Sequence, residues 1–286
     1  MDKWKYQEKI KVDMYDVDPW GDLRISRLME RLLVTASRHL EQLDWSWTHL
    51  ARDLGVCLVL VESAVNIEKN AWLGDELTLT TWTGGKVYPM MFRGFEVRDA
   101  AGDTVASAFM RSVLMDMNTR TIANALKYNL TPLSQPEDMP DFAELSGRLR
   151  GFRRMVLSGG EPDFSDTRRV CYADLDYNGH MNTARYAEYV EGLFGSDWRN
   201  GYRLCGMDVR YEKEIPQGTL LEMRGSYNRD NAEGAGDAVG TGDAVGAGKG
   251  SNAEGADNAA GVVQIVADGE GQERFAAKAY YAKRHG

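Results

Sequence analysis

The chain has 286 residues, and 43% of them are hydrophobic, which is enough for two domains of ordinary size with their own cores. Its formal net charge of -9 argues against a nucleic-acid-binding surface, because such surfaces are usually basic. No apolar run approaches the roughly 20 residues that cross a bilayer, and the N-terminus lacks the apolar stretch of a secretory signal, so we expect no membrane insertion.

The segment 1–127 has the pattern of one module. Tyr15 to Leu23 carries several aspartates and a glycine, and a helical pattern follows with apolar residues three and four positions apart. These apolar residues are Ile25, Leu28, Met29, Leu32, Leu33 and Ala36. The strand-like segments after the helix are 56–67, 76–83, 91–98 and 104–115. Such a helix buries its apolar stripe against one face of an antiparallel sheet.

The segment 128–167 loses this periodicity, and we interpret it as an inter-domain linker. A short helical pattern occurs near 142–149. The prolines that interrupt the segment are Pro132, Pro136, Pro140 and Pro162.

The segment 168–286 repeats the plan of the first module. Ala173 to Met181 has acidic residues and a glycine in the same places as Tyr15 to Leu23, and a second helical pattern follows. Its apolar residues are Tyr186, Tyr189, Val190 and Leu193, and Asn182 or Thr183 is expected to cap its first turn. The strand-like segments are 204–214, 219–227, 262–267 and 274–283.

Two further features complete the organisation. Glu68-Lys69 and Glu212-Lys213 both end a predicted strand and precede a glycine-containing turn, which supports duplication of one module. The stretch 228–261 is almost entirely Gly, Ala, Asp, Asn and Glu, and we expect a disordered low-complexity loop there. The predicted fold class is α+β, with two tandem modules that each wrap an antiparallel sheet around a long helix.

The residues that can carry chemistry lie in the second module. Asp176, Asn178 and His180 are spaced two apart just before a helix, and Glu214 stands at the end of a predicted strand. Taken singly, each of the first three is usually a helix cap. Together they offer a proton-transfer group, carboxylates and an amide donor beside a helix start, whose free N–H groups favour an oxyanion.

These residues resemble a known family. Asp-x-Asn-x-His-x-Asn, preceded by Asp-Leu, followed by a tyrosine-bearing helix and later by Tyr-x-x-Glu, is similar to the motif of the acyl-ACP thioesterases of plants and bacteria. The resemblance covers nearly the whole chain. It implies two tandem hot-dog domains, hydrolysis of fatty acyl groups from acyl carrier protein at the end of fatty acid synthesis, and Asp176, Asn178, His180 and Glu214 as catalytic residues.

One departure from the family limits the mechanism. Many members carry a cysteine after the glutamate, and Ile215 stands there in this chain, so water is the expected attacking group. Asn178 would donate to the carbonyl oxygen, and backbone N–H groups of residues 179–182 would share the oxyanion. Asp176 would orient the imidazole of His180. Either Glu214 or His180 would take the proton from water.

The first module keeps the frame without this chemistry. Trp20 stands in the place of Asn178, Asp22 in that of His180, and Asn70 near that of Glu214. We therefore expect one catalytic site per chain, with the first module helping to bind the acyl tail. The candidate substrate-binding residues are Trp72, Met90 and Met91 for the tail, and Arg153 and Arg154 for the acidic carrier.

Several alternatives remain open at this point. An acyl-CoA thioesterase, a hot-dog hydroxyacyl-thioester dehydratase and a non-catalytic acyl-thioester-binding protein would share much of the pattern. We expect no cofactor and no metal, since the sequence has neither HExxH nor another ligand spacing. Three scattered cysteines without a CxxC spacing favour a cytoplasmic location, and a homodimer is compatible with the sequence.

Overall fold

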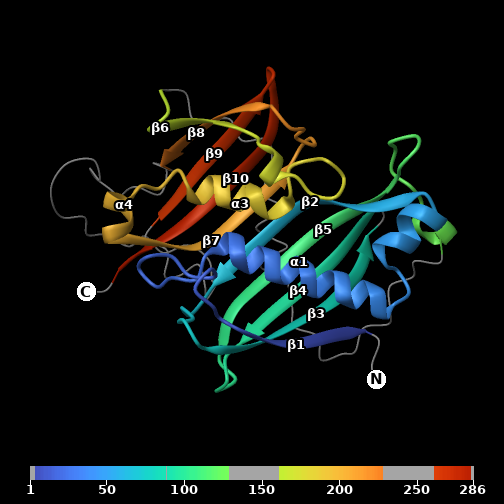
Figure 1. Ribbon diagram of the computed structural model, residues 1–286, viewed down its shortest axis with the longest axis horizontal. Helices are drawn as coiled ribbons and strands as arrows, with labels where there is room; N and C mark the ends of the chain where they lie inside the picture. Colours follow the sequence, from blue (N-terminus) through green and yellow to red (C-terminus); the bar gives the residue numbers. More distant parts are fainter. Residues whose placement is uncertain (1–3, 88, 129–160, 228–260, 285–286) are drawn as a thin grey trace. The chain divides into compact units, whose positions relative to one another are not determined.

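The computed structural model describes residues 4–87, 89–128, 161–227 and 261–284, in two compact units that span residues 1–151 and 152–286 (Figure 1). The boundary between the units falls inside the predicted linker. The predicted helix at 142–149 and nearly all of the low-complexity segment lie outside the described residues.

Unit 1 is an antiparallel sheet with one long helix, α1, packed on it (Figure 1). The strand order is β1-β3-β4-β5-β2. The elements are β1 (Lys5–Lys11), α1 (Ile25–Gln42), β2 (Val56–Ile67), β3 (Glu76–Val87), β4 (Met90–Arg98) and β5 (Thr104–Asp116), with single helical turns at His49–Asp53 and Ala125–Tyr128.

The core of unit 1 follows the two periodicities of the sequence. Leu28 and Leu32 lie one turn apart on α1, and both are buried. On β3, Leu77 and Leu79 alternate with more exposed threonines, as a strand with one buried face requires. Each fully buried side chain of this size contributes about 1.5–3 kcal/mol relative to an exposed one.

Unit 2 repeats this arrangement with the strand order β7-β10-β9-β8-β6, again antiparallel. Its helix α3 packs on β7, and Tyr186 of that helix meets Phe275 of the sheet at 5.0 Å between ring centroids. The elements are β6 (Phe164–Arg169), a 3-10 turn (Tyr172–Asp174), α3 (Thr183–Glu191), α4 (Ser196–Gly201), β7 (Tyr202–Tyr211), β8 (Leu220–Tyr227), β9 (Gly261–Gly269) and β10 (Gln272–Lys283).

The predicted α+β class with a helix on an antiparallel sheet in each unit is confirmed, with local differences. The helix of unit 2 has 9 residues against 18 in unit 1 and ends at Glu191, so Leu193 lies beyond it and not on its apolar face as predicted; glycines follow at 192 and 195, and glycine weakens helices. The short helix α4 was not predicted. Strand β6 begins at Phe164, inside the predicted linker. Strand β7 ends at Tyr211, so Glu214 lies in the following turn and not at the strand end.

Candidate active site

A tight loop before α3 holds three of the four candidate residues. One carboxylate oxygen of Asp176 accepts hydrogen bonds from the backbone N–H groups of Asn178 and His180, at 2.8 and 3.3 Å. The backbone of Asp176 donates to the carbonyl of His180 at 2.8 Å and accepts from Gly179 at 3.0 Å. Gly179 has φ +79°, a conformation that glycine adopts at little cost. Asp176 therefore sets the shape of the loop.

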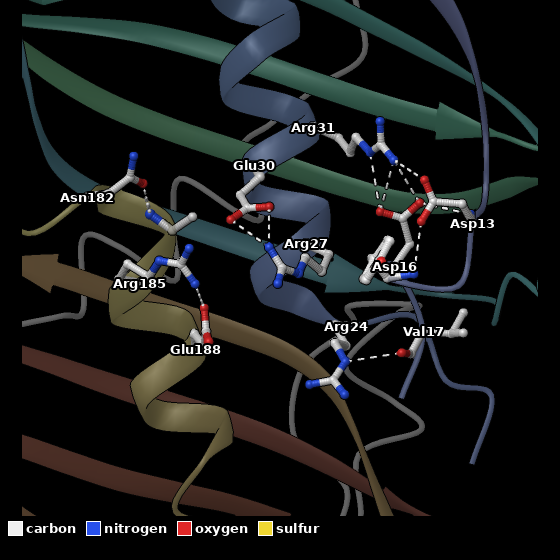
Figure 2. A network of polar contacts seen from close by, with 12 residues as sticks. Asp13, Asp16, Val17, Arg24, Arg27, Glu30, Arg31, Asn182, Arg185 and Glu188 are labelled. Carbon is white, nitrogen blue, oxygen red and sulfur yellow. Dashed lines mark hydrogen bonds and ion pairs between the residues drawn. The ribbon is translucent and has the colours of Figure 1, made fainter. Parts of the chain in front are cut away.

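Side chains at both ends fasten this loop to its own unit. The side chain of Asn182 accepts from the backbone N–H of Ala184 at 3.0 Å, which confirms the predicted cap of α3 (Figure 2). The carboxylate of Asp174 accepts from the hydroxyl of Tyr189 at 2.8 Å and from the backbone N–H of Cys171 at 2.7 Å. The start of α3 and the 3-10 turn thus fix the loop from two directions.

Glu214 reaches the loop from the turn after β7. The backbone N–H of Met181 donates to the carbonyl of Ile215 at 2.8 Å, and His180 forms an isolated β-bridge with Pro216. These contacts bring Nε2 of His180 within 3.4 Å of a carboxylate oxygen of Glu214, with the two side chains 33% and 37% exposed. The pair is thus preformed and open to water.

The four candidate residues come together as predicted, but two predicted roles differ from the observed contacts. The carboxylate of Asp176 accepts from the loop itself, including a long contact of 3.4 Å from the side-chain amide of Asn178, and not from the imidazole of His180. The backbone N–H groups of residues 179–182 all have acceptors within the unit. They are therefore engaged in holding the loop, whereas the side chain of Asn178 in the same loop is exposed.

Two residues that the sequence did not assign to the site lie close to it. Tyr186 is buried on α3, and burial above all raises the pKa of its hydroxyl, with further contributions from the carboxylates of Asp176 and Glu214. It therefore stays neutral beside them. Arg274 of β10 donates from its side chain to the backbone carbonyl of Glu214 at 3.1 Å. Tyr186 looked like an apolar-face residue, and nothing in the local sequence linked Arg274 to Glu214.

Unit 1 has a loop with the same hydrogen bonds. A carboxylate oxygen of Asp18 accepts from the backbone N–H groups of Trp20 and Asp22, at 2.9 and 3.0 Å. Gly21 has φ +80° and donates to the carbonyl of Asp18, as Gly179 does in the other loop. The predicted duplication therefore extends to individual hydrogen bonds.

The loops also have equivalent supports outside their tight turns. Arg31 of α1 contacts the carboxylates of Asp16 and Asp13 (Figure 2). At the equivalent position of unit 2, Tyr189 of α3 contacts Asp174. Each support joins the helix to an acidic residue two positions before the carboxylate that shapes the loop. Arg31 and Tyr189 therefore play the same supporting role, although only the arginine carries a charge.

The loop of unit 1 is closed over by neighbouring side chains. Asn70 accepts from the N–H of Leu23 at 3.0 Å and donates to the carbonyl of Gly21 at 3.1 Å. The indole of Trp72 lies against Gly21, so close that a β-carbon on this glycine would be 2.7 Å from the ring. A β-carbon on Gly179, the equivalent glycine of unit 2, would meet nothing within 4 Å. The described turn of unit 1 thus has Asp22 and Asn70 at the positions of His180 and Glu214.

The structure gives the predicted substrate-binding residues different surroundings. Trp72 is 57% exposed and covers the loop of unit 1. Met91 packs against a buried cluster made of Leu50, Val56, Leu114 and Ala125, and Met90 is the first residue of β4. The predicted carrier-binding residues, Arg153 and Arg154, lie outside the described residues.

Two further observations concern the described part of the chain only. There, no group of three or more histidine, cysteine and acidic side chains is placed to hold a metal ion. Nor is any described helix long and apolar enough to cross a membrane.

Comparisons with known proteins match both units to one family. The model of the acyl-ACP thioesterase N-terminal domain matches residues 3–130, and that of the C-terminal domain matches residues 161–253. A chloroplastic acyl-[acyl-carrier-protein] hydrolase of Cuphea viscosissima is 20% identical over 226 residues, which cover 76% of this chain and 54% of that protein. The chain thus spans about half the length of this curated relative.

Solved structures show the same fold. An acyl-ACP thioesterase from Bacteroides thetaiotaomicron is 18% identical, with a TM-score of 0.71 over 98% of this chain and 100% of that one. A 12:0-ACP thioesterase from Umbellularia californica is 16% identical, with a TM-score of 0.75 over 98% of this chain and 95% of that one. The predicted architecture of two tandem hot-dog domains is confirmed.

Proposed function

Because the chain belongs to the acyl-ACP thioesterase family, we propose that it hydrolyses fatty acyl-[acyl carrier protein] to a free fatty acid and the carrier thiol, which ends fatty acid synthesis. The observation that carries the proposal is the His180–Glu214 pair, with 3.4 Å between Nε2 and the carboxylate. An acid–base pair open to water beside an exposed amide donor has the components that thioester hydrolysis needs.

The proposed reaction uses water as the nucleophile. The His180–Glu214 pair takes a proton from water as its oxygen bonds to the thioester carbon, and the carbonyl becomes an oxyanion. The C–S bond then breaks, and the proton held by the pair goes to the departing thiolate. Because the two groups lie within ion-pair distance, we treat them as one proton-transfer unit. Ile215 next to Glu214 offers no thiol for a covalent intermediate.

Asn178 is the proposed oxyanion donor. Its side chain is exposed, and its hydrogen bond to Asp176 is long at 3.4 Å, so the amide can turn to a substrate oxygen. The loop amides of residues 179–182 are engaged and cannot serve without opening the loop. Removing one such donor typically costs about 100- to 1,000-fold in kcat.

Thiol release from a panel of acyl-ACPs of different chain lengths tests the function. We expect turnover by the wild type and a loss of about 100-fold or more in kcat for His180→Ala and for Glu214→Gln. Full turnover in both variants would remove the mechanism. Thiol release only from acyl-CoA would indicate an acyl-CoA thioesterase. Water loss from a hydroxyacyl thioester would indicate a dehydratase, and binding without release would indicate a non-catalytic protein.

The N-terminal unit is the proposed acyl-binding half. Met91 supports this role best, because it packs on an apolar cluster of that unit and a flexible thioether adapts to varied chains. Met90 and Trp72 belong to the same proposal, although the contact of Trp72 with Gly21 also gives it a structural role. Changing Met91 to Ala or Phe should shift the preferred chain length while leaving thiol release intact.

The proposed partner is the acyl carrier protein, which is acidic. Arg168 and Arg169 donate to backbone carbonyls of Gly192 and Gly218, at 3.0 and 3.2 Å, so they are partly engaged within their own unit. We propose that carrier binding uses Arg153 and Arg154, which lie outside the described residues. Reversing both charges should raise KM for acyl-ACP more than for a short acyl-CoA, and an equal effect on the two substrates would remove this assignment.

The cytoplasm is the proposed location. Cys57, Cys171 and Cys205 are all free thiols, which fits a reducing compartment. The Cuphea relative is described as chloroplastic, and fractionation of the native source would decide between the two.

A further inference from the structure

Arg274 lies near the start of β10 and uses its side chain to join three segments. Its guanidinium donates to the carbonyl of Glu214 at 3.1 Å, to the carbonyl of Gly269 at 3.2 Å and to the carboxylate of Glu270 at 2.6 Å. Arg274 is only 8% exposed. A buried guanidinium with several fixed acceptors is rigid, because its planar fork allows one arrangement.

The backbone of Arg274 holds the same turn. Its carbonyl accepts from the N–H groups of Glu212 and Lys213, at 3.0 and 3.2 Å. Three successive residues, 212 to 214, are therefore bonded to one residue of β10. This attachment continues to the catalytic glutamate after the ladder of β7 has ended at Tyr211.

Unit 1 provides an internal comparison. There the carbonyl of Val105 accepts from the N–H groups of Glu68 and Lys69, again at 3.0 and 3.2 Å, so Val105 occupies the position of Arg274 and Asn70 that of Glu214. Valine has no donor for the next carbonyl. In its place, the side chain of Asn70 holds the turn.

The two units thus fix the same turn in different ways. In unit 1 the side chain at the catalytic position bonds to the loop and is occupied. In unit 2 the Glu214 carboxylate faces His180, and the backbone of Glu214 is held from outside by Arg274. A residue that must keep its side chain available for chemistry needs another element to fix its backbone.

We propose that Arg274 is a positioning residue that holds Glu214 at His180 through the Glu214 carbonyl. This inference rests on the proposed function. Arg274 acts through Glu214 and does not touch substrate. Loss of the Arg274 side chain therefore lowers kcat by no more than the contribution of Glu214 to kcat. It leaves substrate binding nearly unchanged.

The test compares Arg274→Met, which keeps the apolar stem, with Arg274→Lys, which keeps one donor. We expect kcat for acyl-ACP to fall about 10-fold or more in Arg274→Met, with KM within about 2-fold, and to recover partly in Arg274→Lys. Arg98→Met is the control in unit 1, where the more exposed Arg98 also donates to a turn carbonyl and to a glutamate. Its kcat should stay within about 2-fold of wild type.

A double-mutant cycle separates positioning from general stability. In a Glu214→Gln background, Arg274→Met should change kcat by less than about 2-fold, because the function it supports is already lost. The same loss in both backgrounds would overturn the proposal. If Arg274→Met does not fold, the cycle is run with Arg274→Lys.

A crystal structure of the Arg274 variant gives a readout that does not depend on turnover. The separation of Nε2 of His180 from the Glu214 carboxylate should exceed the 3.4 Å of the wild type. An unchanged separation would overturn the positioning role. A wild type that releases no thiol from any acyl thioester would refute the proposed function and leave this geometric result standing.

Discussion

Replacing Asp176 with alanine removes the acceptor that holds the candidate catalytic loop closed. Replacing it with asparagine keeps an oxygen for the two backbone N–H groups and removes the negative charge. The pair of variants therefore separates two roles for this carboxylate. If Asp176 shapes the loop, the asparagine variant retains most of its turnover. If its charge stabilises the imidazolium of His180, both variants lose activity alike.

The size of the effect follows from the two distances. A hydrogen bond to a charged group contributes about 1.5–3 kcal/mol. The bond from Asn178 is short at 2.8 Å, and that from His180 is weak at 3.3 Å, so together we assign them about 2–4 kcal/mol. Two backbone bonds within the loop remain and limit the opening. We expect a fall in kcat of about 10- to 100-fold for Asp176→Ala and less than about 5-fold for Asp176→Asn.

Turnover of acyl-ACP and urea unfolding of each variant make the comparison. The control is Asp18→Ala in unit 1, which removes an acceptor of two hydrogen bonds, of 2.9 and 3.0 Å, in a loop that lacks the His180–Glu214 pair. It should lower the free energy of unfolding by about 2–4 kcal/mol and leave kcat of the folded protein within about 2-fold. Equal losses in Asp176→Asn and Asp176→Ala, or wild-type turnover in the alanine variant, would refute the loop-shaping role.

Three further predictions concern stability, each read from urea unfolding. Gly179→Ala should cost about 1–2 kcal/mol from its positive φ alone, and Gly21→Ala should cost more because its new methyl meets the indole ring at 2.7 Å; equal losses would contradict this reading. Arg93→Met should raise the unfolding midpoint, because desolvation lowers the pKa of Arg93 to about 10 and its described hydrogen bonds go to an imidazole nitrogen and a hydroxyl; a lower midpoint would argue against it. Tyr189→Phe should cost about 1.5–3 kcal/mol through the lost bond of 2.8 Å to a carboxylate, and an unchanged midpoint would show that the bond is dispensable.

The sequence predicted the elements that depend on local patterns. The helix pattern after Leu23, the strand-like segment 76–83 and the cap at Asn182 are all local, and each was observed. The loop residues Asp176 and His180 could be placed beside a helix start for the same reason. Their approach to Glu214 was inferred from the family motif, and the structure brings His180 and Glu214 together.

Other features of the site depend on contacts between distant segments. The bond from Arg274 to the carbonyl of Glu214 joins residues 60 positions apart, and no periodicity signals it. The N–H groups of Met181 and Asn182 donate to the carbonyls of Ile215 and Asp174. These acceptors could be identified only once both segments were placed in space. Trp72 looked like a ligand-binding aromatic residue, and only coordinates place its ring on Gly21.

The bonds made by Asn70 have an evolutionary consequence. A glutamate at position 70 would remove the amide that accepts from Leu23 and donates to Gly21. A histidine at position 22 would place a larger ring where Asp22 is 8% exposed. Either substitution alone would weaken the turn before an acid–base pair formed, so single substitutions do not readily build the site of unit 2 into unit 1.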